Sequence, residues 1–218
     1  MKGDKLVIQE GHVEAARQLM ALLLPQIMNT QTTFTITIAG ESGSGKSEIG
    51  AVLSDLLSEK GIISIILQQD DYFVYPPKTN AEMRRKDLAH VGLSEVRLAL
   101  LDQNLQDIME GKIEIKKPLV IFEEDRIDKE TITVEGIKVV IVEGTYTTKL
   151  RNVHQHIFID RTYIDTRETR KHRAREEQDE FLEKVLQIEH NIISSHKPQA
   201  DIIISKNYQV KKNDGTEK

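Results

Sequence analysis

One segment of this chain constrains its fold more than any other. Residues 40–47 read Gly-Glu-Ser-Gly-Ser-Gly-Lys-Ser and match the phosphate-binding pattern G-x-x-x-x-G-K-[ST] at every fixed position. An alternating run of Thr, Phe and Ile precedes them over residues 33–39, and a helical pattern follows from about residue 46 to residue 59. A strand, a loop of this type and a helix in this order are typical of α/β proteins that bind nucleoside triphosphates.

The chemistry of this loop depends mainly on its backbone. Its glycines let N–H groups converge on anionic oxygens, and the positive end of the following helix faces the same anion. We expect Lys46 to reach the β- and γ-phosphates and the Ser47 hydroxyl to coordinate Mg²⁺. The residues expected to bind the nucleotide are Gly40, Glu41, Ser42, Gly43, Ser44, Gly45, Lys46 and Ser47. The alternative, a chance glycine-rich turn, does not explain the strand and the helix on either side.

The rest of the chain alternates between predicted strands and helices. Buried strands are predicted at 62–67, 138–142, 156–160 and 202–204, and helices at 94–110 and 176–195. This alternation predicts an α/β fold, a three-layer sandwich of the P-loop NTPase type with a mostly parallel sheet. Residues 112–136 predict a small β-hairpin extension. We expect residues 74–91 to be an irregular binding loop or lid.

Acidic residues follow three of the predicted strands, at the sheet edge where open α/β proteins bind ligands. Of Glu143 and Asp160, we prefer Glu143 as a second Mg²⁺ ligand, because Gly144 lets the chain turn close to the metal. Of Asp70 and Asp71, we prefer Asp70 as the carboxylate that accepts the proton of an attacking hydroxyl. The alternatives are a solvated strand end for Glu143 and a turn-capping pair for the two aspartates.

A basic segment near the C-terminus could form a lid over the phosphates. It contains Arg167, Arg170, Lys171, Arg173 and Arg175. The guanidinium fork suits phosphate oxygens, and such arginines can offset charge on a transferring group. The alternative is a solvated helix face whose arginines pair locally with Asp165 and Glu168.

Composition excludes several classes of partner and site. The net charge of −5 argues against non-specific binding to nucleic acid. The chain has no cysteine, which excludes disulfides and thiolate zinc sites and is compatible with a reducing cytoplasm. The apolar run at residues 19–24 is too short to span a bilayer. We therefore expect a cytoplasmic protein with no membrane or nucleic-acid partner; a homo-oligomer stays open.

Three of these segments together resemble a known family. The loop at 40–47, the sequence Gln-Asp-Asp-Tyr-Phe at 69–73 and Val-Ile-Val-Glu-Gly at 140–144 are similar to the uridine kinase and phosphoribulokinase family of P-loop kinases. The resemblance implies transfer of the γ-phosphoryl group of ATP, with Mg²⁺, to a small-molecule hydroxyl. It implies that Asp70 is the catalytic base and that Arg170, with Arg167 or Arg173, closes the site. The matching segments lie within residues 31–210, which we expect to form the kinase domain. Outside them, apolar residues at helical spacing over about 11–28 predict that residues 1–30 form an N-terminal helical extension packed on it, and residues 211–218 read as a polar tail.

The acceptor side departs from the family pattern. Residues 89–93 keep only His90 of an Asp-His-Pro-Asp-Ala-like stretch, and Asp125 falls near the position of a base-binding histidine. Residues 118–122 keep the proline and phenylalanine of a Pro-x-Tyr-Asp-Phe stretch and lack its Tyr-Asp. We expect a nucleoside, uridine or cytidine, as the acceptor, with Asp70, Tyr72 and Arg167 contacting it. Tyr72 could instead belong to the core.

Other acceptors and another function class stay open. Pantothenate, a sugar or a sugar phosphate could replace the nucleoside, and the basic residues 84–86 could serve a phosphorylated acceptor. A nucleotide-binding protein without catalysis is the alternative of a different class. The Asp-x-x-Gly and Asn-Lys-x-Asp motifs of GTPase switches and the Leu-Ser-Gly-Gly-Gln signature of transporter ATPases are absent.

Overall fold

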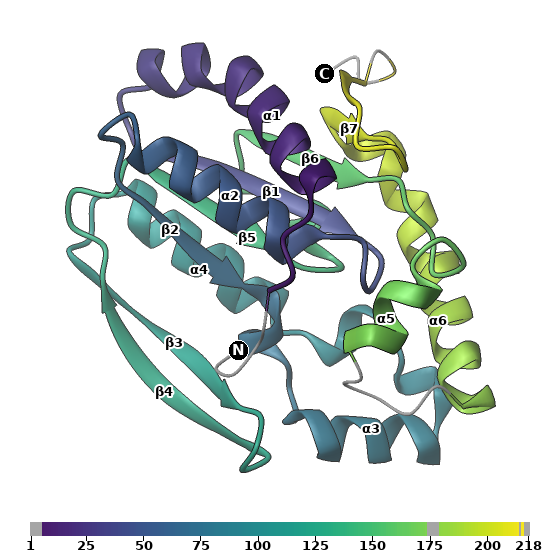
Figure 1. Ribbon diagram of the computed structural model, residues 1–218. Helices are drawn as coiled ribbons and strands as arrows, with labels where there is room; N and C mark the ends of the chain where they lie inside the picture. Colours follow the sequence, from purple (N-terminus) through teal and green to yellow (C-terminus); the bar gives the residue numbers. More distant parts are fainter. Residues whose placement is uncertain (1–5, 174–178, 214, 216–218) are drawn as a thin grey trace.

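The computed structural model describes residues 6–173, 179–213 and 215 (Figure 1). Its α-helices are α1 (Glu10–Asn29), α2 (Lys46–Ser58), α3 (Pro77–Lys86), α4 (Leu98–Met109), α5 (Arg167–Arg173) and α6 (Glu180–Ile193). Its strands are β1 (Phe34–Gly40), β2 (Ser64–Gln68), β3 (Glu114–Ile121), β4 (Arg126–Thr133), β5 (Val139–Glu143), β6 (Gln155–Ile159), β7 (Ile202–Ile204) and β8 (Val210–Lys212). Short 3₁₀ helices are η1 (Gln69–Tyr72), η2 (Leu88–His90), η3 (Leu93–Glu95), η4 (Thr147–Lys149) and η5 (Ser194–Gln199).

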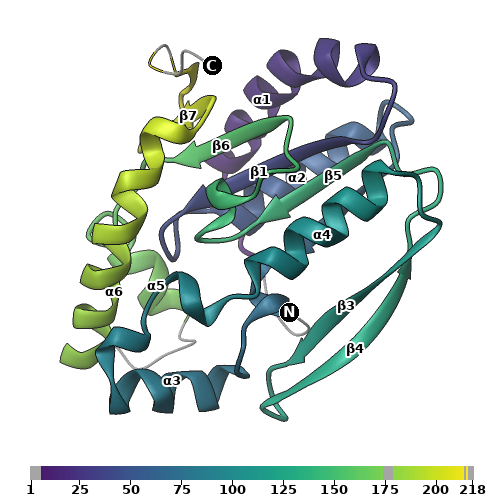
Figure 2. The same ribbon diagram turned by 180° about the vertical axis from the view of Figure 1, so that it is seen from behind.

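Six strands form the central sheet in the order β2-β5-β1-β6-β7-β8. All neighbours pair in parallel except β7 and β8. Helices α1 and α2 cover one face, and α4 lies across the other (Figures 1 and 2). This arrangement confirms the predicted three-layer α/β fold. Because β1, β2 and β5 run in parallel, their carboxyl ends meet at one edge of the sheet.

The sheet separates two hydrophobic cores. Strand β5 is buried along its whole length, and its residues alternate between the two faces. Val139 and Ile141 join the core under α1 and α2, whereas Val140 and Val142 join the core under α4. Helix α1 contributes Leu19, Leu23 and Ile27 to the first of these cores, each with no exposed side-chain surface.

The predicted hairpin extension is confirmed: β3 and β4 pair antiparallel, from Glu114 opposite Thr133 to Ile121 opposite Arg126. The expectation of an irregular segment at 74–91 is wrong, because it contains α3. Pro77 is tolerated in the first turn of α3, where a helix needs no N–H donor. The Asp125 carboxylate, from the distant hairpin turn, accepts hydrogen bonds from the first backbone N–H groups of α3. A cap from a residue this far along the chain leaves no local signal.

The C-terminal segment also joins the sheet. Lys211 and Lys212, which the sequence assigns to a polar tail, pair with β7 as part of β8. In the part of the chain that the structure describes, no helix is both long enough and apolar enough to cross a membrane.

Candidate active site

The phosphate-binding pattern forms a turn between the end of β1 and the start of α2. Gly43 and Gly45 have φ of 75° and 102°, in the left-handed region that favours glycine. Gly45 is the residue that precedes the first turn of α2. The Lys46 ammonium donates a hydrogen bond to the Glu41 carbonyl oxygen at 3.0 Å, so this side chain lies across the loop. The eight predicted residues therefore form one turn at a helix N-terminus, a geometry that suits an anion.

Glu143 lies beside this loop at the end of β5. Its neighbours in the sheet are Ile38 of β1 and Gln68 of β2, and only 5% of its surface is exposed. Burial and the negative charge of Asp70 raise the pKa of Glu143 to about 7, while Lys46 and a hydrogen bond from Ser47 act in the opposite direction. The structure thus brings together Ser47, Lys46, Asp70 and Glu143.

Asp70 lies on the short helix η1. The residues on either side of it, Gln69 and Asp71, hold this helix in place. The Gln69 amide oxygen accepts a hydrogen bond from the Tyr146 backbone N–H at 2.7 Å. The Gln69 side chain packs so closely on Gly144 that a Cβ there would lie 2.2 Å from the Gln69 Cβ. This contact ties η1 to the segment that follows Glu143.

Asp71 holds η1 on the opposite side. Its carboxylate accepts hydrogen bonds from the Lys117 ammonium at 2.8 Å and from the Val120 backbone N–H at 3.1 Å. Both side chains of the Asp71–Lys117 ion pair are less than 10% exposed. Asp71 therefore links η1 to strand β3. This geometry favours a structural role for Asp71 and leaves Asp70, which is partly exposed, as the carboxylate nearer to the ligand side.

Two other residues predicted on the acceptor side have structural contacts. Tyr72 is fully buried, and its hydroxyl donates a hydrogen bond to Asn104 at 2.8 Å. This position favours the core alternative over a substrate contact. Arg84 forms ion pairs with Glu95 and Glu189, the latter at 3.0 Å. Its charge is therefore already compensated by carboxylates, which weakens the case for Arg84 as a site for a phosphorylated acceptor.

Helix α5, the predicted lid, lies against the phosphate loop. The Thr166 hydroxyl donates a hydrogen bond to the Ser42 carbonyl oxygen at 2.9 Å. Arg170 is 6% exposed, and its Cγ lies 3.0 Å from the position that a Cβ on Gly43 would occupy. Arg167 is exposed and pairs with Glu183 at 3.1 Å. The side chain of Arg173 and all of Arg175 lie outside the described residues.

Glu41 links the loop to the lid and to α6. Its buried carboxylate accepts a hydrogen bond from the Tyr163 backbone N–H, and its other oxygen lies 2.7 Å from His190 Nδ1. The sequence predicts a phosphate contact for Glu41. The structure leaves its backbone for that role, since the side chain is engaged elsewhere. Sequence reasoning missed the supporting residues Gln69, Lys117, Tyr163, Thr166 and His190, because each acts through a partner distant in the chain.

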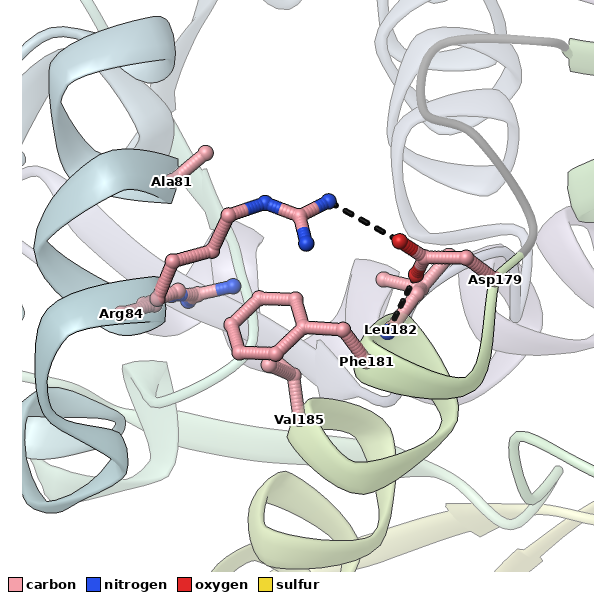
Figure 3. A pocket seen from close by; sticks show the side chains of 7 residues that line it. Ala81, Arg84, Asp179, Phe181, Leu182 and Val185 are labelled. Carbon is pink, nitrogen blue, oxygen red and sulfur yellow. Dashed lines mark hydrogen bonds and ion pairs between the residues drawn. The ribbon is translucent and has the colours of Figure 1, made fainter.

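A pocket of about 190 Å³ lies between α3 and α6 (Figure 3). It is lined by Ala81, Arg84, Arg85, Asp179, Phe181, Leu182 and Val185. Arg85 pairs with Asp179 at 2.9 Å, and its guanidinium lies 4.4 Å from the centre of the Phe181 ring. These contacts join α3, on the acceptor side, to the helix that follows the lid.

Comparison with known proteins gives concordant results. Residues 35–206 match the model of the phosphoribulokinase / uridine kinase family. The bifunctional alpha-galactosidase/sucrose kinase AgaSK of Mediterraneibacter gnavus is 28% identical over 84% of this chain. A uridine kinase of Ureaplasma parvum is 32% identical over 55% of the chain. The matches span 21% of the first relative and 56% of the second. A uridine kinase of Lactobacillus johnsonii is 27% identical, over 81% of this chain and 88% of its own length.

Solved structures agree on the fold. A possible uridine kinase from Bacillus stearothermophilus superimposes with a TM-score of 0.63 at 18% identity, over 86% of this chain and 97% of that one. D-glycerate 3-kinase from Cryptococcus neoformans gives a TM-score of 0.60 at 15% identity, over 90% and 98% of the two chains. At these identities the likeness concerns the fold alone.

Proposed function

The chain belongs to the phosphoribulokinase / uridine kinase family, and from this premise we propose that it transfers the γ-phosphoryl group of ATP to a hydroxyl of a nucleoside. The observation that carries the proposal is the convergence of Asp70, Glu143 and Ser47 beside Lys46, at the edge where β1, β2 and β5 end. A phosphoryl-transfer site needs such an arrangement, with an anion cradle, a metal position and a carboxylate.

Ser47 and Glu143 are the residues that would hold Mg²⁺. A buried carboxylate that receives a hydrogen bond from a hydroxyl, with Lys46 nearby, suits a cation more than it suits an empty core position. Proteins usually bind Mg²⁺ through one or two side chains and the substrate phosphates, so these two residues are enough for the protein's share of the ligands. When bound, Mg²⁺ offsets negative charge on the transferring group.

The remaining roles follow from position. Lys46 contributes a positive charge to the β- and γ-phosphates, and Asp70 accepts the proton of the attacking hydroxyl. Arg170, which already contacts the loop at Gly43, stabilises charge on the transferring group. Arg167 is more exposed and is assigned to the mouth of the site, where an acceptor enters.

A free sugar is the second candidate acceptor, and two observations favour it. One relative, matched over 84% of this chain, is the bifunctional alpha-galactosidase/sucrose kinase AgaSK. Asp125, near the position of the family's base-binding histidine, is engaged in capping α3 through Lys78 and Thr79. Both candidates present a sugar hydroxyl to Asp70, so they differ in what the hairpin side must recognise.

A screen of acceptors tests the proposal. ATP consumption is measured by a coupled assay with uridine, cytidine, pantothenate, free sugars and sugar phosphates, and the products are identified by mass spectrometry. We expect consumption that depends on an acceptor and a product heavier by one phosphoryl group. Slow ATP hydrolysis that no acceptor accelerates would support the non-catalytic alternative instead.

A further inference from the structure

We infer that His12 of α1 is a positioning residue for the donor nucleotide, acting through the phosphate loop. The inference rests on the proposed function for the identity of the ligand, a nucleoside triphosphate. The contacts of His12 do not depend on that function. His12 and its partner Tyr208 both lie outside residues 35–206, the segment that matches the family. The N-terminal helix is therefore not a passive addition but part of the support of the site.

His12 packs directly on the loop. A Cβ placed on Gly45 would lie 2.8 Å from His12 Nε2 and 3.0 Å from Cδ2. No side chain fits there, and the imidazole fills the space that one would take. Gly45 has φ of 102° and directly precedes Lys46, the first residue of α2. The conformation of Gly45 determines where the first N–H groups of α2 point, so a ring that covers it restrains the anion cradle.

The imidazole is itself held by hydrogen bonds at both nitrogens. His12 is 4% exposed, and its Nδ1 accepts a hydrogen bond from the Gln9 backbone N–H at 3.1 Å. An Nδ1 that accepts is unprotonated, so the ring proton is on Nε2. This Nε2–H donates to the Tyr208 hydroxyl oxygen at 3.0 Å. The ring orientation at Gly45 is therefore fixed from α1 and from the C-terminal turn.

Tyr208 completes the support. Its ring packs on the backbone of Gly11, where a Cβ would lie 2.3 Å from the ring. It meets the His12 ring edge to face, with centroids 5.1 Å apart. The Tyr208 backbone has φ of 62°, a conformation that non-glycine residues rarely adopt. Arg161, at the end of β6, donates a hydrogen bond to the Tyr208 hydroxyl and lies over its ring. Tyr208 and Arg161, from two other segments, thus support the His12 ring, which packs on one glycine of the loop.

This convergence explains what α1 contributes. A loop that is rigid before the ligand arrives loses less conformational entropy on binding, so it binds more tightly. The effect should fall on the donor, because His12 packs on the phosphate loop at Gly45. The acceptor KM should therefore stay close to its original value.

The test measures binding of ATP with Mg²⁺ by calorimetry in the absence of an acceptor, alongside Tm. We expect His12→Ala to weaken ATP binding by about tenfold, equivalent to about 1.4 kcal/mol. His12→Gln, which keeps an N–H donor, should recover part of this loss. Gln18→Ala is the matched control: it removes another contact between α1 and the C-terminal segment, the hydrogen bond from the Val210 N–H at 2.9 Å, away from the loop.

The outcomes separate the inference from the proposed function. Weaker ATP binding by His12→Ala, with Gln18→Ala unchanged, supports the inference. Equal ATP affinity in His12→Ala and the unaltered protein overturns it. If the unaltered protein binds no ATP, the proposed function fails first. Should His12→Ala not fold, Tyr208→Phe keeps the ring on Gly11 and removes the hydroxyl, and the same two results decide.

Discussion

The proposed donor and acceptor halves of this site are built differently. The donor half is a backbone structure, in which Gly43 and Gly45 shape a turn at the N-terminus of α2. The acceptor half depends on buried charged side chains from distant segments, such as the Asp71–Lys117 pair and the Arg84–Glu95 pair. A backbone cradle needs particular residues in one short stretch, and it is visible as a motif. A network of side chains can be assembled from many positions and leaves no local pattern.

The largest expected effect falls where the two halves meet. Asp70→Asn removes the carboxylate that we propose as the proton acceptor, and we expect turnover to fall by about 10²–10⁴-fold, the usual contribution of a general base. ATP affinity should change little, because Asp70 lies on η1 and not on the loop. Steady-state kinetics and calorimetry on the same preparation measure the two quantities.

Asp55→Asn is the control for this change, since Asp55 is an exposed carboxylate on α2. It should leave turnover and affinity unaltered. If Asp71→Asn abolished turnover at an unchanged Tm while Asp70→Asn retained activity, the assignment of the base would be wrong. The division of roles between the two aspartates would then have to be reversed.

The variant Lys46→Ala tests the donor half. The change removes one positioned positive charge from the phosphates, and we expect turnover to fall by about 10²–10³-fold. Lys60→Ala, an exposed lysine just beyond the same helix, serves as the control and should have no effect. Stopped-assay kinetics at saturating ATP measure the loss. Normal turnover in Lys46→Ala would remove the phosphate loop from the mechanism.

The contrast between the halves also accounts for what could be predicted from sequence. The loop, the strand before it, the helix after it and the hairpin were predictable because each has its own residue pattern. Helix α3 was not, because the cap that holds its first turn is Asp125, contributed by the hairpin turn. Tyr72 was assigned a possible substrate contact from its place in the chain, and the partner that buries it, Asn104, belongs to α4. The errors fall where a distant side chain decides the local structure.

The acceptor half can be loosened without touching the reacting groups. Lys117→Met leaves the Asp71 carboxylate buried without its ammonium partner, and we expect a loss of about 3 kcal/mol in the free energy of unfolding. The pair of Lys112 with Asp107, in which the lysine side chain is 53% exposed, offers a matched control. Lys112→Met should change stability by less than about 1 kcal/mol. Urea denaturation measures both variants.

The double variant sharpens this test. Asp71→Asn combined with Lys117→Met removes both charges, keeps an oxygen that can accept from the Val120 N–H, and should recover most of the lost stability, because no buried charge is left without a partner. If Lys117→Met is as stable as the unaltered protein, the ion pair does not support η1. The acceptor half would then rely on its apolar contacts alone.

The smallest expected effect concerns acid. His196 is 1% exposed and packs edge to face on Tyr146, just beyond Glu143. Burial, with a smaller contribution from Lys149, lowers the pKa of His196 to about 4. Its unfolded pKa is near 6.5, so folding excludes a proton from this ring. The free energy of unfolding therefore suffers no penalty from His196 above pH 6.5, and it decreases as the pH falls from 6.5 toward 4.

The variant His196→Phe keeps an aromatic ring against Tyr146 and removes the titration. When the pH is lowered from 7.5 to 5.0, we expect the free energy of unfolding to fall by about 2 kcal/mol more in the unaltered protein than in His196→Phe. At pH 5, about 1.5 units below the unfolded pKa, His196 is protonated in the unfolded chain but mostly neutral in the folded protein. Urea denaturation at both pH values measures this difference, and a comparison of pH 7.5 with 8.5 is the control, in which His196 should contribute nothing. Equal acid sensitivity of the two proteins would mean that His196 is not the group through which acid weakens the fold.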